Sequence, residues 1–183
     1  MLKRIWPLLI MCIFLILNVT TIANAKSPLP NGFRNLIWGQ TLNDFSEKNS
    51  MQDISILLKE KELEKDESAY KRLNNDNMIS GVGPLEIVYL FWRGKFEAIN
   101  AYTQGHYNFD ALVESAKKNF GNPASKENNQ YFNRIVWQNK KTEIVITMSG
   151  NDNLVHLHMK SLAIEDEKKK WKKAHKTGFY YKW

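Results

Sequence analysis

The chain has 183 residues and one cysteine, with 43% hydrophobic and 25% charged residues, which is the composition of a folded protein rather than a disordered one. Its net charge of +7 is concentrated in residues 165–183, which carry seven lysines and three acids, so the rest of the chain lacks the broad basic surface of a nucleic-acid-binding domain. We therefore expect no nucleic-acid partner.

Residues 1–25 have the pattern of a cleavable secretory signal peptide. Two basic residues precede an apolar run from Ile5 to Leu17, and small residues flank the predicted cleavage position in Ala23-Asn24-Ala25. Cleavage after Ala25 would remove Cys12, so the mature chain would contain no thiol. A chain exported in this way would be located in the periplasm or outside the cell. An uncleaved anchor is the alternative, but the apolar run is shorter than the about 20 residues that span a bilayer.

The mature chain begins with short elements. After a lead-in that contains two prolines, residues 33–38 are predicted to form a strand. Thr41 is expected to cap a brief helix, with Asp44 in its first turn.

The next segment is ambiguous because its apolar residues suit either a strand or a helix. We favour two strands, at about residues 53–58 and 68–73. The charged run 59–67 between them is expected to be a solvent-exposed turn whose charges have no partner.

The clearest predicted element is a hairpin of residues 85–92 and 96–103. Its turn is Arg93-Gly94-Lys95, in which Gly94 can take a positive φ. Apolar residues occupy both faces of the first strand, so we expect that strand to be central and covered on both sides.

A well-defined helix is predicted after this hairpin. Asn108 is expected as its N-cap, apolar residues recur with helical spacing from Phe109 to Phe120, and Gly121 with Pro123 beyond it marks the end. Alternation of apolar and polar residues then predicts three strands of a sheet with one wet face, near residues 131–137, 142–148 and 154–162.

A terminal helix is predicted from about residue 164 to residue 175, because three acids precede the lysines and Glu165 can pair with Lys169. The predicted fold class is α+β: an antiparallel sheet of about five to seven strands with helices packed on one side, plus a C-terminal helix. The predicted organisation is a signal peptide (1–25), a single α+β domain (26–164), and a basic, aromatic C-terminal helix and tail (165–183).

The sequence resembles a family of small exported bacterial proteins that have no assigned biochemical role. The family shares an aromatic-Arg-x-x-x-Trp-Gly start and a central hairpin that turns through Gly-Lys-Phe. The resemblance implies a shared fold and an envelope location, and it implies no catalytic residue. The matching segments are Phe33 to Gly39, Tyr70-Lys71-Arg72, Ile79-Ser80-Gly81, Ile87 to Phe96 and Phe120-Gly121-Asn122-Pro123.

Two histidines form a weak candidate metal site. His156 and His158 are two residues apart on a predicted strand, so both point to the same face. A third ligand would have to come from His106, Glu143 or another acid. The alternative is that both are ordinary surface histidines.

Two arginines and the tail are the other candidate binding residues. Arg34 and Arg72 lie among apolar residues and could bind a carboxylate or phosphate, or could instead close ion pairs with Asp44 or Asp76. The tail combines lysines with aromatic residues, which suits an anionic membrane surface, or else it forms a solvated helix that folds back on the sheet. The tail residues concerned are Lys168, Lys169, Lys170, Trp171, Lys172, Lys173 and Lys176.

No nucleophile elbow, zinc-binding helix motif or phosphate-binding loop is present in the sequence, and we expect no cofactor. The leading hypothesis is a non-catalytic binding or accessory module whose partner is an envelope protein. The first alternative is a peripheral binder of an anionic membrane or polyanion through the C-terminal tail. The second is a metal-dependent enzyme that uses His156 and His158.

Overall fold

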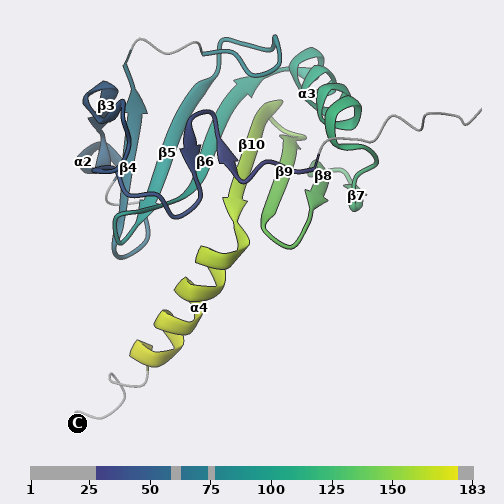
Figure 1. The fold of residues 1–183 in the computed structure, drawn as a ribbon. Helices are drawn as coiled ribbons and strands as arrows, with labels where there is room; N and C mark the ends of the chain where they lie inside the picture. The colour runs from purple at the N-terminus through teal and green to yellow at the C-terminus, as the bar shows by residue number, and fades with distance from the viewer. Residues whose placement is uncertain (1–27, 59–62, 74–76, 177–183) are drawn as a thin grey trace, which may run out of the picture.

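The computed structural model describes residues 28–58, 63–73 and 77–176. The predicted leader, part of the charged run and the aromatic end of the tail lie outside these ranges. Within them, Figure 1 shows one large twisted sheet, a long helix against one of its faces and a second long helix that leaves the sheet at its lower end.

The sheet has eight antiparallel strands in the order β3-β4-β5-β6-β10-β9-β8-β7. The predicted α+β class is confirmed, and the sheet is larger than the five to seven strands expected. The strands are β3 (Met51–Asp53), β4 (Glu67–Arg72), β5 (Glu86–Trp92), β6 (Lys95–Gln104), β7 (Ser125–Asn128), β8 (Phe132–Gln138), β9 (Thr142–Ser149) and β10 (Leu154–Ser161).

One face of the sheet carries the main core. Helix α3 (His106–Phe120) packs on this face together with a small hairpin formed by β1 (Gly32–Phe33) and β2 (Leu36–Ile37) (Figure 1). The apolar stripe of α3 contacts the alternate side chains of the central strands that point toward it. The buried residues of that stripe are Phe109, Leu112, Val113 and Ala116.

Among the described residues, the cover on the opposite face lies over β4, β5 and β6. The single helical turn α2 (Ser55–Leu58) packs Leu58 toward Val88 and Leu90, which alternate along β5 with the core residues of the other face. Residues 87–92 of β5 are consequently all buried. This confirms the prediction of a central strand covered on both sides.

Helix α4 (Leu162–Lys176) continues directly from β10 and projects past the end of the β5–β6 hairpin (Figure 1). This confirms the predicted terminal helix, and the expected pair of Glu165 and Lys169 forms at 3.3 Å. Among the described residues, no helix is both long and apolar enough to cross a membrane.

Several local predictions were wrong near the N-terminus. The strand expected at residues 33–38 is interrupted by a turn at Arg34, whose φ is 55°, and the segment forms the β1–β2 hairpin instead. The brief helix expected after Thr41 is a pair of turns, although Thr41 Oγ1 does donate to Asp44 at 2.5 Å. A 3-10 turn, η1 (Lys48–Ser50), follows and leads into β3.

The strand expected at residues 53–58 ends at Asp53. The Asp53 carboxylate accepts a hydrogen bond from the backbone N–H of Ser55 at 2.8 Å and starts the helical turn α2. Helix α3 also begins two residues before its predicted cap, at His106. Asn108 lies inside the helix, and its amide donates back to Thr103 Oγ1 at 2.9 Å.

The predicted end of α3 is confirmed, since Gly121 follows the helix with a φ of 93°. The hairpin turn is tighter than expected, because Trp92 pairs with Lys95 and only Arg93 and Gly94 form the loop. The edge strand β7 was not predicted. Its four residues are polar and exposed, so the sequence has no alternation to reveal them.

Candidate functional site

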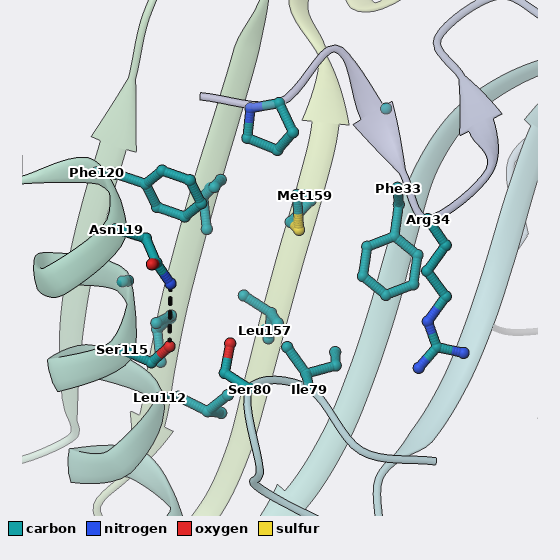
Figure 2. Close-up of a pocket in the computed structure, with 15 residues that line it drawn as sticks. Phe33, Arg34, Ile79, Ser80, Leu112, Ser115, Asn119, Phe120, Leu157 and Met159 are labelled. Atoms are coloured by element: carbon teal, nitrogen blue, oxygen red, sulfur yellow. Dashed lines mark hydrogen bonds between the residues drawn. The ribbon is translucent and has the colours of Figure 1, made fainter. Parts of the chain in front are cut away.

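An apolar cavity of about 190 Å³ lies between α3, the β1–β2 hairpin and the sheet surface formed by β9 and β10 (Figure 2). Segments from the two ends of the described chain therefore form one site. It is lined by Pro30, Gly32, Phe33, Arg34, Ile79, Ser80, Leu112, Ser115, Ala116, Asn119, Phe120, Ile144, Ile146, Leu157 and Met159.

The helix side of the cavity is a stripe of residues with helical spacing. Leu112, Ser115, Ala116 and Asn119 are separated by three, one and three positions, which places them on one face of α3. Two of them are small where a larger side chain would fill the space against the sheet. The cavity thus follows from the choice of Ser115 and Ala116 on an otherwise well-packed helix.

The sheet side is formed by alternate residues of two paired strands. Leu157 lies opposite Ile146 in the register of β10 and β9, and Met159 lies opposite Ile144. Because side chains alternate along a strand, all four point to the α3 face and provide a rigid apolar floor.

A buried hydrogen-bond relay holds the N-terminal wall in place. Thr142 is 0% exposed, and its hydroxyl donates to the carbonyl oxygen of Pro30 at 2.6 Å. The same hydroxyl accepts a hydrogen bond from the indole of Trp38 at 2.8 Å. The lead-in segment, the hairpin and the start of β9 are therefore tied together beside the cavity.

The lining of the cavity contains few polar side chains, those of Arg34, Ser80, Ser115 and Asn119. Among the described lining residues, Arg34 is the only charged one, and Figure 2 shows it beside Phe33 at the edge of the site. Its guanidinium donates to the carbonyl of Met78 at 3.1 Å and lies 5.1 Å from the centre of the Phe33 ring. Asn119 donates to the Ser115 hydroxyl at 3.4 Å across the helix side of the rim.

The two candidate arginines are not brought together. Arg72 lies on β4, where it pairs with Glu47 and sits 5.5 Å from the Phe45 ring. Its carboxylate partner is Glu47 and not the suggested Asp44, and Asp76 lies outside the described residues. Arg72 therefore fixes β4 to the turn that precedes β3, whereas Arg34 belongs to the cavity.

The two histidines lie together on the face of the sheet opposite the cavity. His156 Nε2 and His158 Nδ1 contact the same atom, Asn100 Oδ1, at 2.9 and 2.7 Å. The Tyr102 ring stacks on His156 with a centroid distance of 4.7 Å and an interplanar angle of 9°. Both are partly buried rather than ordinary surface histidines, and burial lowers the pKa of His156 and brings the pKa of His158 down to about 4.

Neither suggested third ligand joins the histidine pair. Glu143 pairs with Lys160 at 3.2 Å, and His106 is exposed at the start of α3. In the described part of the chain, no group of three His, Cys, Asp or Glu side chains is placed to hold a metal ion.

Two lysines of α4 are engaged with the body of the protein. Lys168 is buried, pairs with Glu67, and lies 3.2 Å from Glu97 and 3.1 Å from Glu64. Lys172 pairs with Glu64 as well. The charged run was therefore wrongly expected to lack partners, because Glu64 and Glu67 anchor the terminal helix.

Glu97 owes its position in this cluster to a β-bulge. Leu90 pairs with Ala98 and Phe91 with Phe96, so Glu97 is the extra residue of β6. Burial, together with a hydrogen bond to Glu67, raises the pKa of Glu97 to about 8. Burial alone would lower the pKa of Lys168, but its contacts with Glu67 and Glu97 raise it overall.

The remaining tail residues divide into two groups. Trp171 packs edge-on against Trp92 at 6.3 Å, and Lys169 pairs with Glu165. Lys170 and Lys173 are exposed, and the side chain of Lys176 lies outside the described part of the structure. The surface left for an anionic partner on α4 is thus smaller than the sequence suggested.

No family model, curated protein or solved structure matches this chain. The resemblance to the exported family consequently stays a prediction.

Proposed function

We propose that the protein is an exported, non-catalytic binding module that holds a small amphipathic anion in the cavity between α3 and the sheet. The observation that carries this proposal is an apolar cavity with a single guanidinium, that of Arg34, at its rim. Its lining contains small and apolar side chains, two hydroxyls and one amide, which suit binding and orientation rather than proton transfer.

The size of the cavity limits the apolar part of the ligand. An apolar cavity of about 150 Å³ holds one benzene molecule. The 190 Å³ available here therefore suits an alkyl chain of about eight carbons, or one ring with a short side chain. We favour the alkyl chain because the floor is formed by the flexible or branched side chains of Ile144, Ile146, Leu157 and Met159.

The charge of the rim selects the other end of the ligand. The guanidinium of Arg34 has five donors in a planar fork that fits a carboxylate, so it can keep its present contacts, such as that with the carbonyl of Met78, and still bind an anion. A medium-chain carboxylate would place its chain over the sheet and its anionic group beside Arg34 and Ser80.

The predicted leader supplies the location. Its basic start, apolar run and Ala23-Asn24-Ala25 site support export to the periplasm or cell envelope. Cell fractionation followed by N-terminal sequencing tests this part, and we expect the recovered chain to begin at Lys26. A chain recovered from the cytosol with Met1 intact would refute export, but it would not bear on the ligand proposed for the cavity.

Titration of the mature chain, residues 26–183, with straight-chain carboxylates tests the ligand. Each methylene buried contributes about 0.8 kcal/mol, or about a fourfold decrease in Kd. We expect the Kd from calorimetry to fall by this factor per carbon from butanoate to octanoate and then to level off. Octanol and octylamine should bind more weakly than octanoate.

Variants that change the size of the cavity test whether the carboxylate binds there. Ala116→Leu on α3 should fill the cavity and abolish octanoate binding. The control Ala163→Leu, which changes an exposed alanine on α4, should leave octanoate binding unchanged. Leu157→Ala should enlarge the cavity and move the plateau to longer chains. Arg34→Gln should bring the affinity for octanoate down to that for octanol. Chain-length dependence that survives Ala116→Leu would refute the proposal.

A further inference from the structure

Three donor atoms converge on the face of the sheet that α3 does not cover. His156 and His158 come from β10, and Asn100 comes from β6, where it lies directly opposite His158 in the register. Both ring nitrogens contact Asn100 Oδ1, at 2.9 and 2.7 Å. The three atoms form a compact N,O,N set on two adjacent strands.

The type of these donor atoms favours certain metals. Each ring nitrogen lies within hydrogen-bond distance of Asn100 Oδ1, so a small movement of the side chains brings the three atoms around one ion. Imidazole nitrogens suit zinc, copper, iron and nickel, and among the divalent first-row metals copper(II) binds such donors most tightly.

We infer that His156, His158 and Asn100 bind a divalent transition metal, copper(II) foremost, with water in the remaining positions. This inference is independent of the ligand proposed for the cavity. On binding, the single proton of each neutral imidazole moves from the ring nitrogen that faces Asn100 to the other ring nitrogen, and the freed nitrogen binds the metal with no net release of a proton.

The surroundings hold the donors in this arrangement. Tyr102 stacks flat on His156, which fixes the plane of that ring, and the two strands are paired on both sides of the site. The nearest cation along β10, Lys160, is paired with Glu143 at 3.2 Å, so part of its repulsion toward a metal is neutralised.

Two depressions border the site. Asn100 lines one that extends toward Tyr102 and Leu154, and His158 lines another that extends toward Glu165 and Lys168. We expect a hydrated ion to approach the donors through these depressions, with water completing its coordination.

Copper(II) titration of the chelator-treated mature chain tests the inference. We expect one ion per chain by calorimetry and a tetragonal copper signal, with hyperfine coupling to two nitrogens, in electron paramagnetic resonance spectra. Spectra without nitrogen coupling would overturn the inference, and this readout needs no variant.

Substitutions then assign the signal to these residues. His156→Gln and His158→Gln should each weaken binding at least tenfold and leave coupling to one nitrogen, and Asn100→Leu should weaken binding while both nitrogens remain. His106→Gln and His175→Gln are matched controls, because both residues are exposed and lie on helices. Copper binding unchanged in the His156→Gln/His158→Gln double variant would overturn the assignment.

Discussion

Removal of the Lys168 charge should destabilise the fold strongly, because Lys168 is the centre of a buried ionic cluster. Its side chain is 7% exposed, and those of its partners Glu67 and Glu97 are 5% and 7% exposed. In Lys168→Met, the Glu67 carboxylate loses its counter-charge while it stays buried. Breaking a buried pair in this way costs about 3–5 kcal/mol, a large part of the about 5–15 kcal/mol by which domains are stable.

Urea unfolding followed by tryptophan fluorescence measures this loss. Lys170→Met, an exposed neighbour on the same helix, should change the free energy of unfolding by less than about 0.5 kcal/mol. The double variant Lys168→Met/Glu67→Gln should regain much of the lost stability, because it removes the unpaired charge. If Lys168→Met alone lies within about 1 kcal/mol of the native chain, the cluster does not anchor α4 as described.

Three further predictions concern buried polar groups. Burial holds the pKa of His158 at about 4, below its ordinary 6.5, so the unfolded chain binds the proton more readily. The contribution of His158 to stability should therefore fall by up to about 3 kcal/mol as the pH drops from about 6.5 to 4, and the stability difference between the native chain and His158→Gln in urea titrations should change by that amount. The raised pKa of Glu97 has the opposite consequence: the contribution of Glu97 should fall as the pH rises from about 4.5 to 8, and Glu97→Gln should unfold at a urea midpoint equal to or above that of the native chain at pH 8. Thr142→Val removes the hydrogen bonds to Trp38 and Pro30, so it should cost about 1–3 kcal/mol and weaken octanoate binding, and an unchanged midpoint and Kd would contradict the role of the relay.

The elements that the sequence predicted well are those whose signals are local. The β5–β6 hairpin has a two-residue turn with positive φ at both Arg93 and Gly94, and its strands carry continuous apolar residues. The end of α3 at Gly121 has an equally local cause. In such segments, neighbours in the chain determine the conformation, so inspection of about ten residues is enough.

Segments whose conformation depends on distant contacts were predicted poorly. Ile56 and Leu57 suggested a buried strand, yet they are 85% and 81% exposed on the one-turn helix α2. The assumption that apolar residues are buried failed there. The cluster around Lys168 joins residues that are 101 positions apart in the chain, and no spacing rule links Glu67 to Lys168.

The candidate sites show the same division. The histidine pair was found because alternation along a strand is a local rule. Asn100, whose Oδ1 both rings contact, was not found, because it is 56 positions from His156 and 58 positions from His158. The cavity was missed altogether. Ser115 and Ala116 are ordinary helix residues, and their small size leaves a void only because of what lies opposite them on β9 and β10.

The cavity and the histidine pair lie on opposite faces of β10, so each can be altered by substitution without changing the side chains of the other. Leu157 and Met159 point into the cavity, and His156 and His158 point away from it. Since side chains alternate with a period of two, a substitution at 156 or 158 changes no side chain of the cavity floor. A slip of one residue between β10 and its neighbours would move all four to the wrong face, so both sites depend on the register that the paired strands fix.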